Sequence, residues 1–253
     1  MDATTLTVWA PTLMLVAVRL VGLVLAGPAL GHSAVPMKIR IAVAIVVSLA
    51  VIARMPGPLE LADAPVQVAL AVGGEFLVGA CIGLSARLVI LGVMLGGFHV
   101  ANQMGLAIGE VAGGTDGQHG GAFRATFGML AVVIYLLLNG HRQMLSAVLR
   151  TFETVPLAGG VAPQSVLRLV VLFLGSSFGL ALNIAAPVLI AMLLATVAMG
   201  MLQKTLPQCN LLTTHLPVRV LLGLIVLAGS IATVRPLLDG AVGVLFETLA
   251  EAL

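Results

Sequence analysis

The sequence predicts an all-α integral membrane protein built from kinked helices and helical hairpins. Of its 253 residues, 60% are hydrophobic and 9% are charged, and the mean hydropathy is +1.17. Residues 169–202 form a run of 34 residues without a charged side chain. Because a helix needs roughly 20 apolar residues to cross a bilayer, this run alone indicates a membrane protein. The apolar runs are continuous rather than alternating, which excludes a closed β-barrel.

Proline, glycine and asparagine residues divide the chain into helices. We expect helices over 7–30, 37–54, 64–108, 123–138, 141–152, 164–202 and 218–252. The helix over 64–108 is too long for a straight rod, so we expect a bend near Gly96 and Gly97. The helix over 164–202 contains Asn183 and Pro187, where we expect a kink or a break.

Several apolar runs are shorter than an ordinary membrane span. Residues 41–53, 125–138 and 220–234 give runs of 13, 14 and 15 residues, below the roughly 18 that indicate a spanning helix. Such short runs favour helices that other protein chains cover. If six spans are assumed, each side of the membrane collects five basic residues, so the positive-inside rule leaves the orientation open.

Small residues recur at four-residue spacing along the predicted helices. The pairs Gly79/Gly83, Gly92/Gly96 and Gly175/Gly179 are examples. On a helix, this spacing forms a groove into which another backbone can pack closely. The spacing predicts close helix packing but leaves open whether the neighbour is a helix of this chain or of a partner.

Three charged residues lie inside apolar sequence, namely Arg19, Glu75 and Arg87. An unpaired charge at membrane depth costs about 3 kcal/mol or more, so these residues need a partner, a cavity or the interface. A proton or ion pathway is one interpretation. We favour an interhelical pair between Glu75 and a basic group on another helix, since Glu75 and Arg87 are too far apart for a bridge within one helix.

No motif in the sequence indicates catalysis, a cofactor or a metal site. Metalloprotease, α/β-hydrolase, Walker A and CxxC patterns are absent. The five histidines are scattered, and Cys81 and Cys209 show no metal-ligand spacing. The net charge of +2 is too small to indicate nucleic-acid binding. We therefore expect a protein that is not an enzyme and binds no cofactor.

A polar, glycine-rich strip, "NQMGLAIGEVAGGTDGQHGGAFR", interrupts the apolar sequence at residues 102–124. Irregular backbone survives at membrane depth only where protein buries it or where it lines a water-filled passage. The strip is therefore either a pliable plug of a conduit or a plain surface loop. The residues we assign to a plug or pore loop are Met104, Gly105, Gly109, Glu110, Gly113, Gly114, Asp116, Gly117 and Gly121, with Met104 contributing to a hydrophobic constriction.

Several segments resemble the FliR family of flagellar biosynthesis proteins, which has relatives in virulence type III secretion. The resemblance begins with "RLVGLVLAGPALGHSAVPMKIRIAVA" at residues 19–44 and continues with "NQMGLAIG", "LLLNGHRQM" and "TFETVPL". The most specific match is "MGMLQKTLPQCNLLTTHLPVRVLLGL" at residues 199–224. The matches run in collinear order over nearly the whole chain, and the wording "NGHR" and "LPQCN" favours the flagellar branch.

The resemblance implies a subunit of the type III export gate in the bacterial inner (cytoplasmic) membrane and the flagellar basal body. It implies a FliP-like part at 1–163 with a plug loop at 105–122, fused to a FliQ-like hairpin at 164–253. The implied partners are FliP, FliQ and FlhB homologues and exported unfolded proteins. We expect partner interfaces at Lys204, Pro207, Gln208, Asn210, Glu75 and Arg87. Family plugs often carry aromatic residues after the "QMG" element, which this strip replaces with small and aliphatic residues.

Together these observations predict a channel subunit of the flagellar protein export gate that helps form and plug the conduit. The alternative from another class is a secondary transporter of a small solute, which predicts inverted repeats and broken helices at matching positions in both halves. The break expected at Asn183 and Pro187 has no counterpart in the first half. An intramembrane enzyme is a weaker third interpretation, because the sequence offers no nucleophile–base pair.

Overall fold

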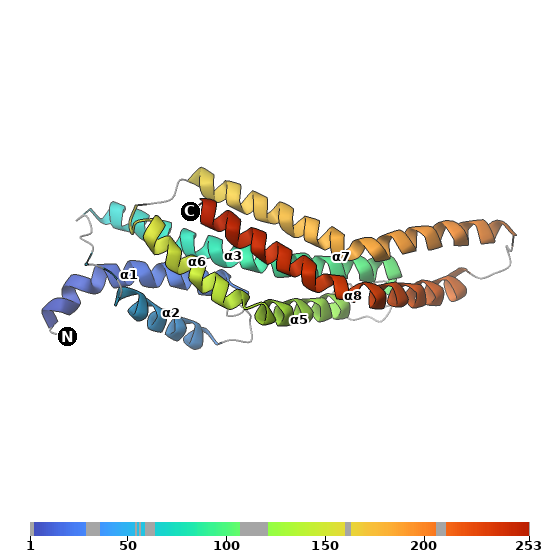
Figure 1. Ribbon diagram of the computed structural model, residues 1–253, viewed down its shortest axis with the longest axis horizontal. Helices are drawn as coiled ribbons and strands as arrows, with labels where there is room; N and C mark the ends of the chain where they lie inside the picture. The colour runs from blue at the N-terminus through green and yellow to red at the C-terminus, as the bar shows by residue number, and fades with distance from the viewer. Residues whose placement is uncertain are drawn as a thin grey trace. The chain divides into compact units, whose positions relative to one another are not determined.

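The computed structural model describes residues 3–28, 36–53, 55, 57–58, 64–106, 121–159, 163–205 and 211–252. Every regular element in these ranges is an α-helix. The helices are α1 (Ala3–Ala26), α2 (Met37–Ile52), α3 (Pro65–Met104), α5 (Gly121–Leu137), α6 (Gly140–Thr154), α7 (Pro163–Thr205) and α8 (Leu211–Ala252) (Figure 1). The prediction of an all-α fold is confirmed.

Proline, glycine and asparagine mark the helix ends, as the sequence predicted. Pro65 and Pro163 are the first residues of α3 and α7, a position where the missing N–H of proline costs nothing. Asn139 separates α5 from α6 with a φ of 57°, and Gly105 follows α3 with a φ of 81°. These left-handed conformations end a helix because the next residue leaves the helical path.

The helices continue without a break through the two positions where the sequence predicted a bend or a kink. Helix α3 continues through Gly96 and Gly97, and α7 continues through Asn183 and Pro187. Helix α8 likewise contains Pro217 and Pro236. Neighbouring helices and local adjustment can satisfy the backbone groups that proline frees in a membrane helix, so a proline there does not have to end the element.

Four of the described helices contain a segment long and apolar enough to cross a membrane. These segments are Val8–Ala26, Pro65–Met104, Gln164–Leu202 and Leu216–Leu249, with mean hydropathies between 2.0 and 2.3. Helices α5 and α6, which meet at an angle of 64°, could form a fifth span as a bent pair. The described residues therefore hold four or five candidate spans by length and composition, fewer than the six assumed from the sequence. The run 220–234, which looked too short, lies inside the Leu216–Leu249 segment.

The chain divides into two compact units. Unit 1 comprises Met1–Leu88, Leu136–Leu174 and Val242–Leu253, and unit 2 comprises Val89–Tyr135 and Gly175–Ala241. Helices α3, α7 and α8 each cross from one unit to the other, so one part of each helix belongs to unit 1 and the other part to unit 2. The boundary predicted at residues 163 and 164 rests on likeness to two other proteins, which the packing of this chain does not test, and it stays a prediction.

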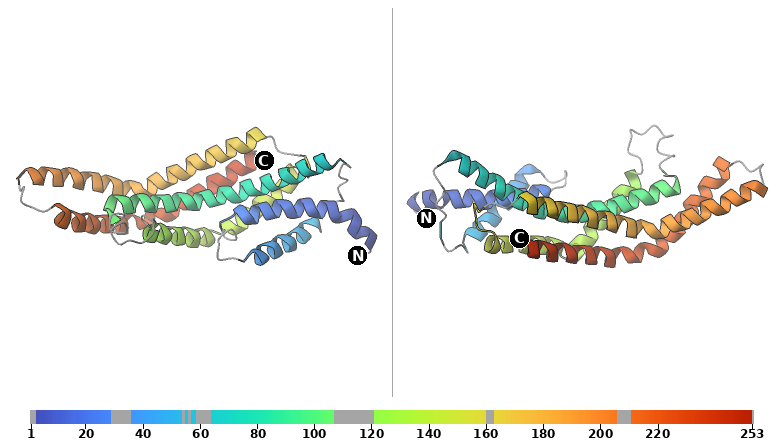
Figure 2. Two further views of the ribbon diagram at one scale, coloured as in Figure 1. Left: turned by 180° about the vertical axis from the view of Figure 1, so that it is seen from behind. Right: turned by 90° about the horizontal axis from the view of Figure 1, so that it is seen from above.

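Each unit has its own packed interior. In unit 1, α1 packs against α2 (Figure 1), and α1 also meets α3 through the glycine contacts described below. In unit 2, a buried cluster joins α3 to α7 through Val100, Met104, Ala185, Val188 and Met192. Leu222, Val226 and Leu227 of α8 pack against this cluster, and the parts of α7 and α8 in unit 2 run alongside each other (Figure 2).

Candidate functional site

Unit 1 contains a buried ion pair between two membrane helices. Arg19 on α1 and Glu75 on α3 are 0% and 3% exposed, and Arg19 Nε donates to Glu75 Oε2 at 2.5 Å. The guanidinium also lies over the ring of Phe152, 4.4 Å from its centre, where a cation is attracted to the aromatic face. The predicted interhelical pair is confirmed, and Arg19 is the basic partner of Glu75.

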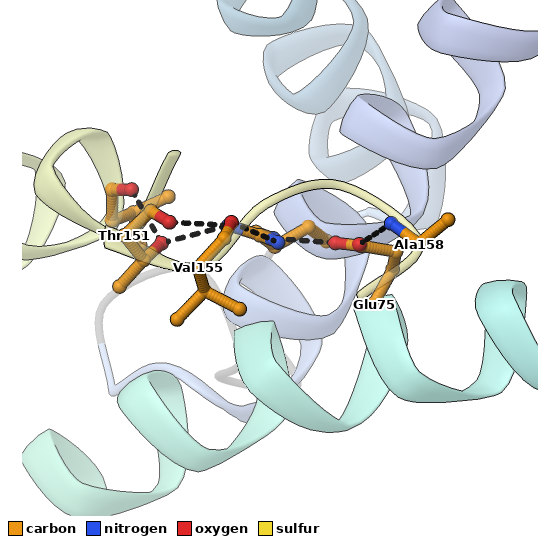
Figure 3. A network of polar contacts seen from close by, with 6 residues as sticks. Glu75, Thr151, Val155 and Ala158 are labelled. Atoms are coloured by element: carbon orange, nitrogen blue, oxygen red, sulfur yellow. Dashed lines mark hydrogen bonds and ion pairs between the residues drawn. The ribbon is translucent and has the colours of Figure 1, made fainter. Parts of the chain in front are cut away.

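The last turn of α6 and the residues that follow it, Val155 and Ala158, supply the remaining partners of this pair (Figure 3). Arg19 donates from one terminal nitrogen to the carbonyl and hydroxyl oxygens of Thr151 at 3.0 and 3.1 Å, and from the other to the carbonyl of Val155 at 3.4 Å. The second carboxylate oxygen of Glu75 accepts from the N–H of Ala158 at 3.0 Å. The carbonyls at a helix C-terminus have no partner within the helix, so a cation suits this position.

Glycines bring α1 and α3 close enough to form the ion pair. A Cβ placed on Gly79 would overlap the carbonyl oxygen of Arg19. A Cβ on Gly22 would lie 2.5 Å from the carbonyl of Phe76, and one on Gly83 would lie 2.5 Å from that of Leu23. The two backbones therefore touch, and the close packing predicted from the Gly79/Gly83 spacing is confirmed within this chain.

The N-terminal end of the predicted plug strip is anchored in the interior of unit 2. Met104, the last residue of α3, is 0% exposed. Its side chain lies against Gly223 of α8, where a Cβ would come within 2.6 Å of Met104 Cε. Gly105 then turns the chain out of α3 in a conformation that other residues rarely adopt, and a Cβ there would approach Leu216 to 2.8 Å.

The C-terminal end of the strip is anchored on the same helix. Phe127 of α5 is buried against Gly97 of α3, where a Cβ would lie 2.5 Å from the ring. One residue on, Gly128 makes room for the side chain of Met94. Helices α3 and α5 are therefore packed together in unit 2, and the strip connects two elements that are fixed relative to each other.

The structure describes some of the other predicted site residues and leaves the rest outside its described ranges. Gly109, Glu110, Gly113, Gly114, Asp116 and Gly117 of the strip, and Pro207, Gln208 and Asn210 of the second loop, lie outside the described residues. Gly121 is the first residue of α5, and Lys204 lies in the last turn of α7. Arg87 is exposed on α3, whereas Glu75 is buried with Arg19. The roles predicted for these residues stay predictions.

Comparison with known proteins identifies the family. The model of the bacterial export proteins, family 1, matches residues 10–243, which include both the ion pair and the two anchors of the strip. The chain belongs to family 1 of the bacterial export proteins. The predicted FliR family is thereby confirmed.

Relatives of this export protein are similar over most of their length. It is 24% identical over 242 residues to the flagellar biosynthetic protein FliR of Pectobacterium carotovorum subsp. carotovorum, covering 93% of this chain and 90% of the relative. It is 25% identical to FliR of Escherichia coli (strain K12), covering 92% and 89%. It is also 25% identical to FliR of Bacillus subtilis (strain 168), covering 96% and 95%. The export protein is a membrane component of the flagellar export apparatus.

Sequence reasoning missed part of the buried network of this export protein. Thr151, Val155 and Ala158 contribute mainly backbone groups, which have no residue signature. The segment "TFETVPL", which carries part of the family resemblance, contains Thr151, Phe152 and Val155. The family resemblance of this segment is the sequence signal that could have located these partners of Arg19 and Glu75, because the side chains of the segment alone suggest no chemistry.

Proposed function

We propose that this export protein is a channel subunit of the flagellar type III protein export gate. In this proposal it helps to form the conduit for unfolded flagellar proteins, and the plug loop at residues 105–122 of the strip closes that conduit between export events. The chain acts in the inner membrane at the flagellar basal body and performs no catalysis of its own. Energy for export comes from partner proteins or the proton gradient.

The observation that carries the proposal is the contrast between the strip and its two anchors. The strip contains six glycines between residues 109 and 121, and glycine gives a backbone many accessible conformations. Its ends join Met104 and α5, which are held by buried contacts with Gly223 and Gly97. Anchoring of this kind would keep a pliable segment at one place while its middle yields to a passing chain.

Exposed apolar surface supports assembly with other subunits. Large side chains on α7 and α8 are exposed in the isolated chain, among them Leu193, Leu194, Met201, Leu221 and Ile225. Exposed apolar area of this extent marks contact with lipid or protein. We assign these faces to FliP and FliQ homologues, and the loop that follows Lys204, with Pro207, Gln208 and Asn210, to an FlhB homologue.

Deletion of residues 113–120 tests the plug. We expect the variant to co-elute with its partner subunits as the intact chain does, because the anchors at Met104 and Phe127 remain. Ion conductance of membranes that contain the assembled variant should rise several-fold, because a shortened strip cannot span the conduit. Growth in high salt should fall in parallel.

A length-matched variant provides the control. Changing Thr115, Gln118 and His119 to serine preserves the length, the glycines and Asp116 of the strip, and it should leave conductance near that of the unchanged protein. An assembled deletion variant with unchanged conductance would refute the plug.

A further inference from the structure

Helix α6 borders a cavity that the proposed function does not use. The cavity has a volume of about 720 Å³, is open to the surface along the exposed face of α6, and lies within unit 1 beside Ile82 of α3 and Leu249 of α8. Ile82, Leu249 and Thr151 are buried and form its inner wall. This volume is within the range of about 300–1,000 Å³ that is typical of small-molecule sites.

The polar face of α6 lines the cavity with two cations and several hydroxyl groups. Met144 and Val148 turn inward, whereas Arg142, Ser146 and Arg150 line the cavity at intervals of four residues. Residues four apart are neighbours on one face of a helix. Neither guanidinium forms an ion pair with another described residue. Glu153 also lines the cavity, so these three charged groups have a net charge of +1.

The spacing of the arginines suits a single phosphate. Arg142 and Arg150 are separated by two turns, or about 12 Å along the helix axis. A phosphate at the level of Ser146 would therefore be about 6 Å from either arginine along that axis, within the length of an extended arginine side chain. Two guanidinium groups can bind one phosphate through parallel hydrogen bonds, and the Ser146 hydroxyl can donate a further one.

We propose that this cavity binds the headgroup of an anionic glycerophospholipid such as phosphatidylglycerol. The phosphate lies between Arg142 and Arg150, and Glu153 and Thr154 accept hydrogen bonds from the headgroup hydroxyls. The apolar wall at Ile82 and Leu249 contacts the glycerol backbone. Anionic phospholipids are part of the bilayer that surrounds a membrane protein, and basic pockets between membrane helices are suited to their headgroups.

Lipid titration of the complete protein, co-purified with its partner subunits in detergent, tests this site. Native mass spectrometry would count bound phosphatidylglycerol and, in a parallel series, phosphatidylcholine. The test variant is Arg142→Gln with Arg150→Gln. The matched control is Arg168→Gln with Arg235→Gln, which removes two exposed arginines that do not line the cavity. We expect phosphatidylglycerol to bind about tenfold more weakly to the test variant only.

Four outcomes would overturn the proposal. Equal losses in both double variants would show general charge attraction, and equal binding of phosphatidylcholine would show that the negative charge is not recognised. Complete displacement of the lipid by millimolar inorganic phosphate would show a site for the free anion. If the test variant does not fold, Ser146→Trp fills the cavity while both arginines remain, and it should abolish tight phosphatidylglycerol binding; retained binding in that variant would also contradict the site.

Discussion

At the scale of single residues, the pairing of Arg19 with Glu75 decides whether α1, α3 and α6 can pack together. A lone charge in this interior would lack both water and a counter-ion, which is strongly unfavourable. Here the guanidinium donates to Glu75 and to the carbonyls of Thr151 and Val155 at the end of α6, and the carboxylate accepts from Ala158. Removing either partner leaves the other charge buried, so the pair acts as one unit in stability.

Substitution of one partner alone should therefore be severe. We expect Arg19→Gln or Glu75→Gln to lower the free energy of unfolding by about 3–5 kcal/mol. The steady-state level of the chain in membranes should fall, and so should the melting temperature of the chain co-purified with its partner subunits in detergent. The double variant Arg19→Met with Glu75→Leu should recover much of the loss, since neither charge remains.

Arg87→Gln is the matched control, because Arg87 lies on the same helix as Glu75 and is exposed. Its effect on the melting temperature should be small. Additive losses from the two single substitutions in the double variant would contradict the coupling of Arg19 and Glu75.

At the scale of elements, α3 meets two different helices through two pairs of glycines. Gly79 and Gly83 admit the backbone of α1, and Gly92 and Gly96 admit α7 at Ser177, Ala181 and Ile184. Close approach of this kind lets dispersion forces hold apolar helices together where no hydrophobic effect operates between them. By contrast, a Cβ on Gly175 or Gly179 of α7 would meet nothing within 4 Å.

Alanine substitutions should separate these two classes of glycine. Gly79→Ala forces a methyl group into the backbone of α1 and should cost about 1–3 kcal/mol or more, seen as a lower melting temperature and weaker swimming. Gly175→Ala should leave the melting temperature of the chain unchanged or slightly raised, because alanine favours helix. A stable Gly79→Ala variant would contradict the close contact of α1 with α3.

At the scale of the whole molecule, exposed apolar faces on α2, α7 and α8 leave much hydrophobic surface without protein contact in the isolated chain. Lipid can cover part of such a surface, but the short α2 has only 16 residues, too few to span a bilayer alone. This combination favours a subunit that is stable mainly inside an assembly.

Expression of the chain alone should therefore give aggregated or degraded protein. Co-expression with FliP and FliQ homologues from the same genome should give a single peak in gel filtration that contains all three chains, because the partners cover the apolar faces. A monodisperse single chain in detergent that takes up a small solute in vesicles would support the transporter alternative instead.

The sequence predicted the helices well because their ends depend on local chemistry. The positions of Pro65, Pro163, Gly105 and Asn139 are visible without a structure. The length of the apolar run at 220–234 is underestimated from the sequence, because Arg219 and Arg235 stand at its two ends. The apolar segment Leu216–Leu249 contains both arginines. Counting apolar residues only up to the nearest charged residue underestimates the length of a long membrane helix.

The candidate site was less accessible to sequence reasoning because its partners are far apart in the chain. Arg19 and Glu75 are separated by 56 residues, so each charge could be recognised as unusual without indicating which residue pairs with it. Glycine spacing predicted close packing in the same way, but only the fold shows that Gly79 faces α1 and that Gly92 faces α7.

Site-specific photocrosslinking to an export substrate stalled in transit tests the conduit most directly. A photoreactive amino acid at Gly113 would report contact with the strip, and one at Leu194, exposed on α7, would serve as the control for a face assigned to partner subunits. Crosslinks from Gly113 to the substrate, together with crosslinks from Leu194 only to other subunits or lipid, are the predicted result. A strip that never crosslinks to the stalled substrate in an assembled, exporting complex would contradict the proposal that it closes the export path.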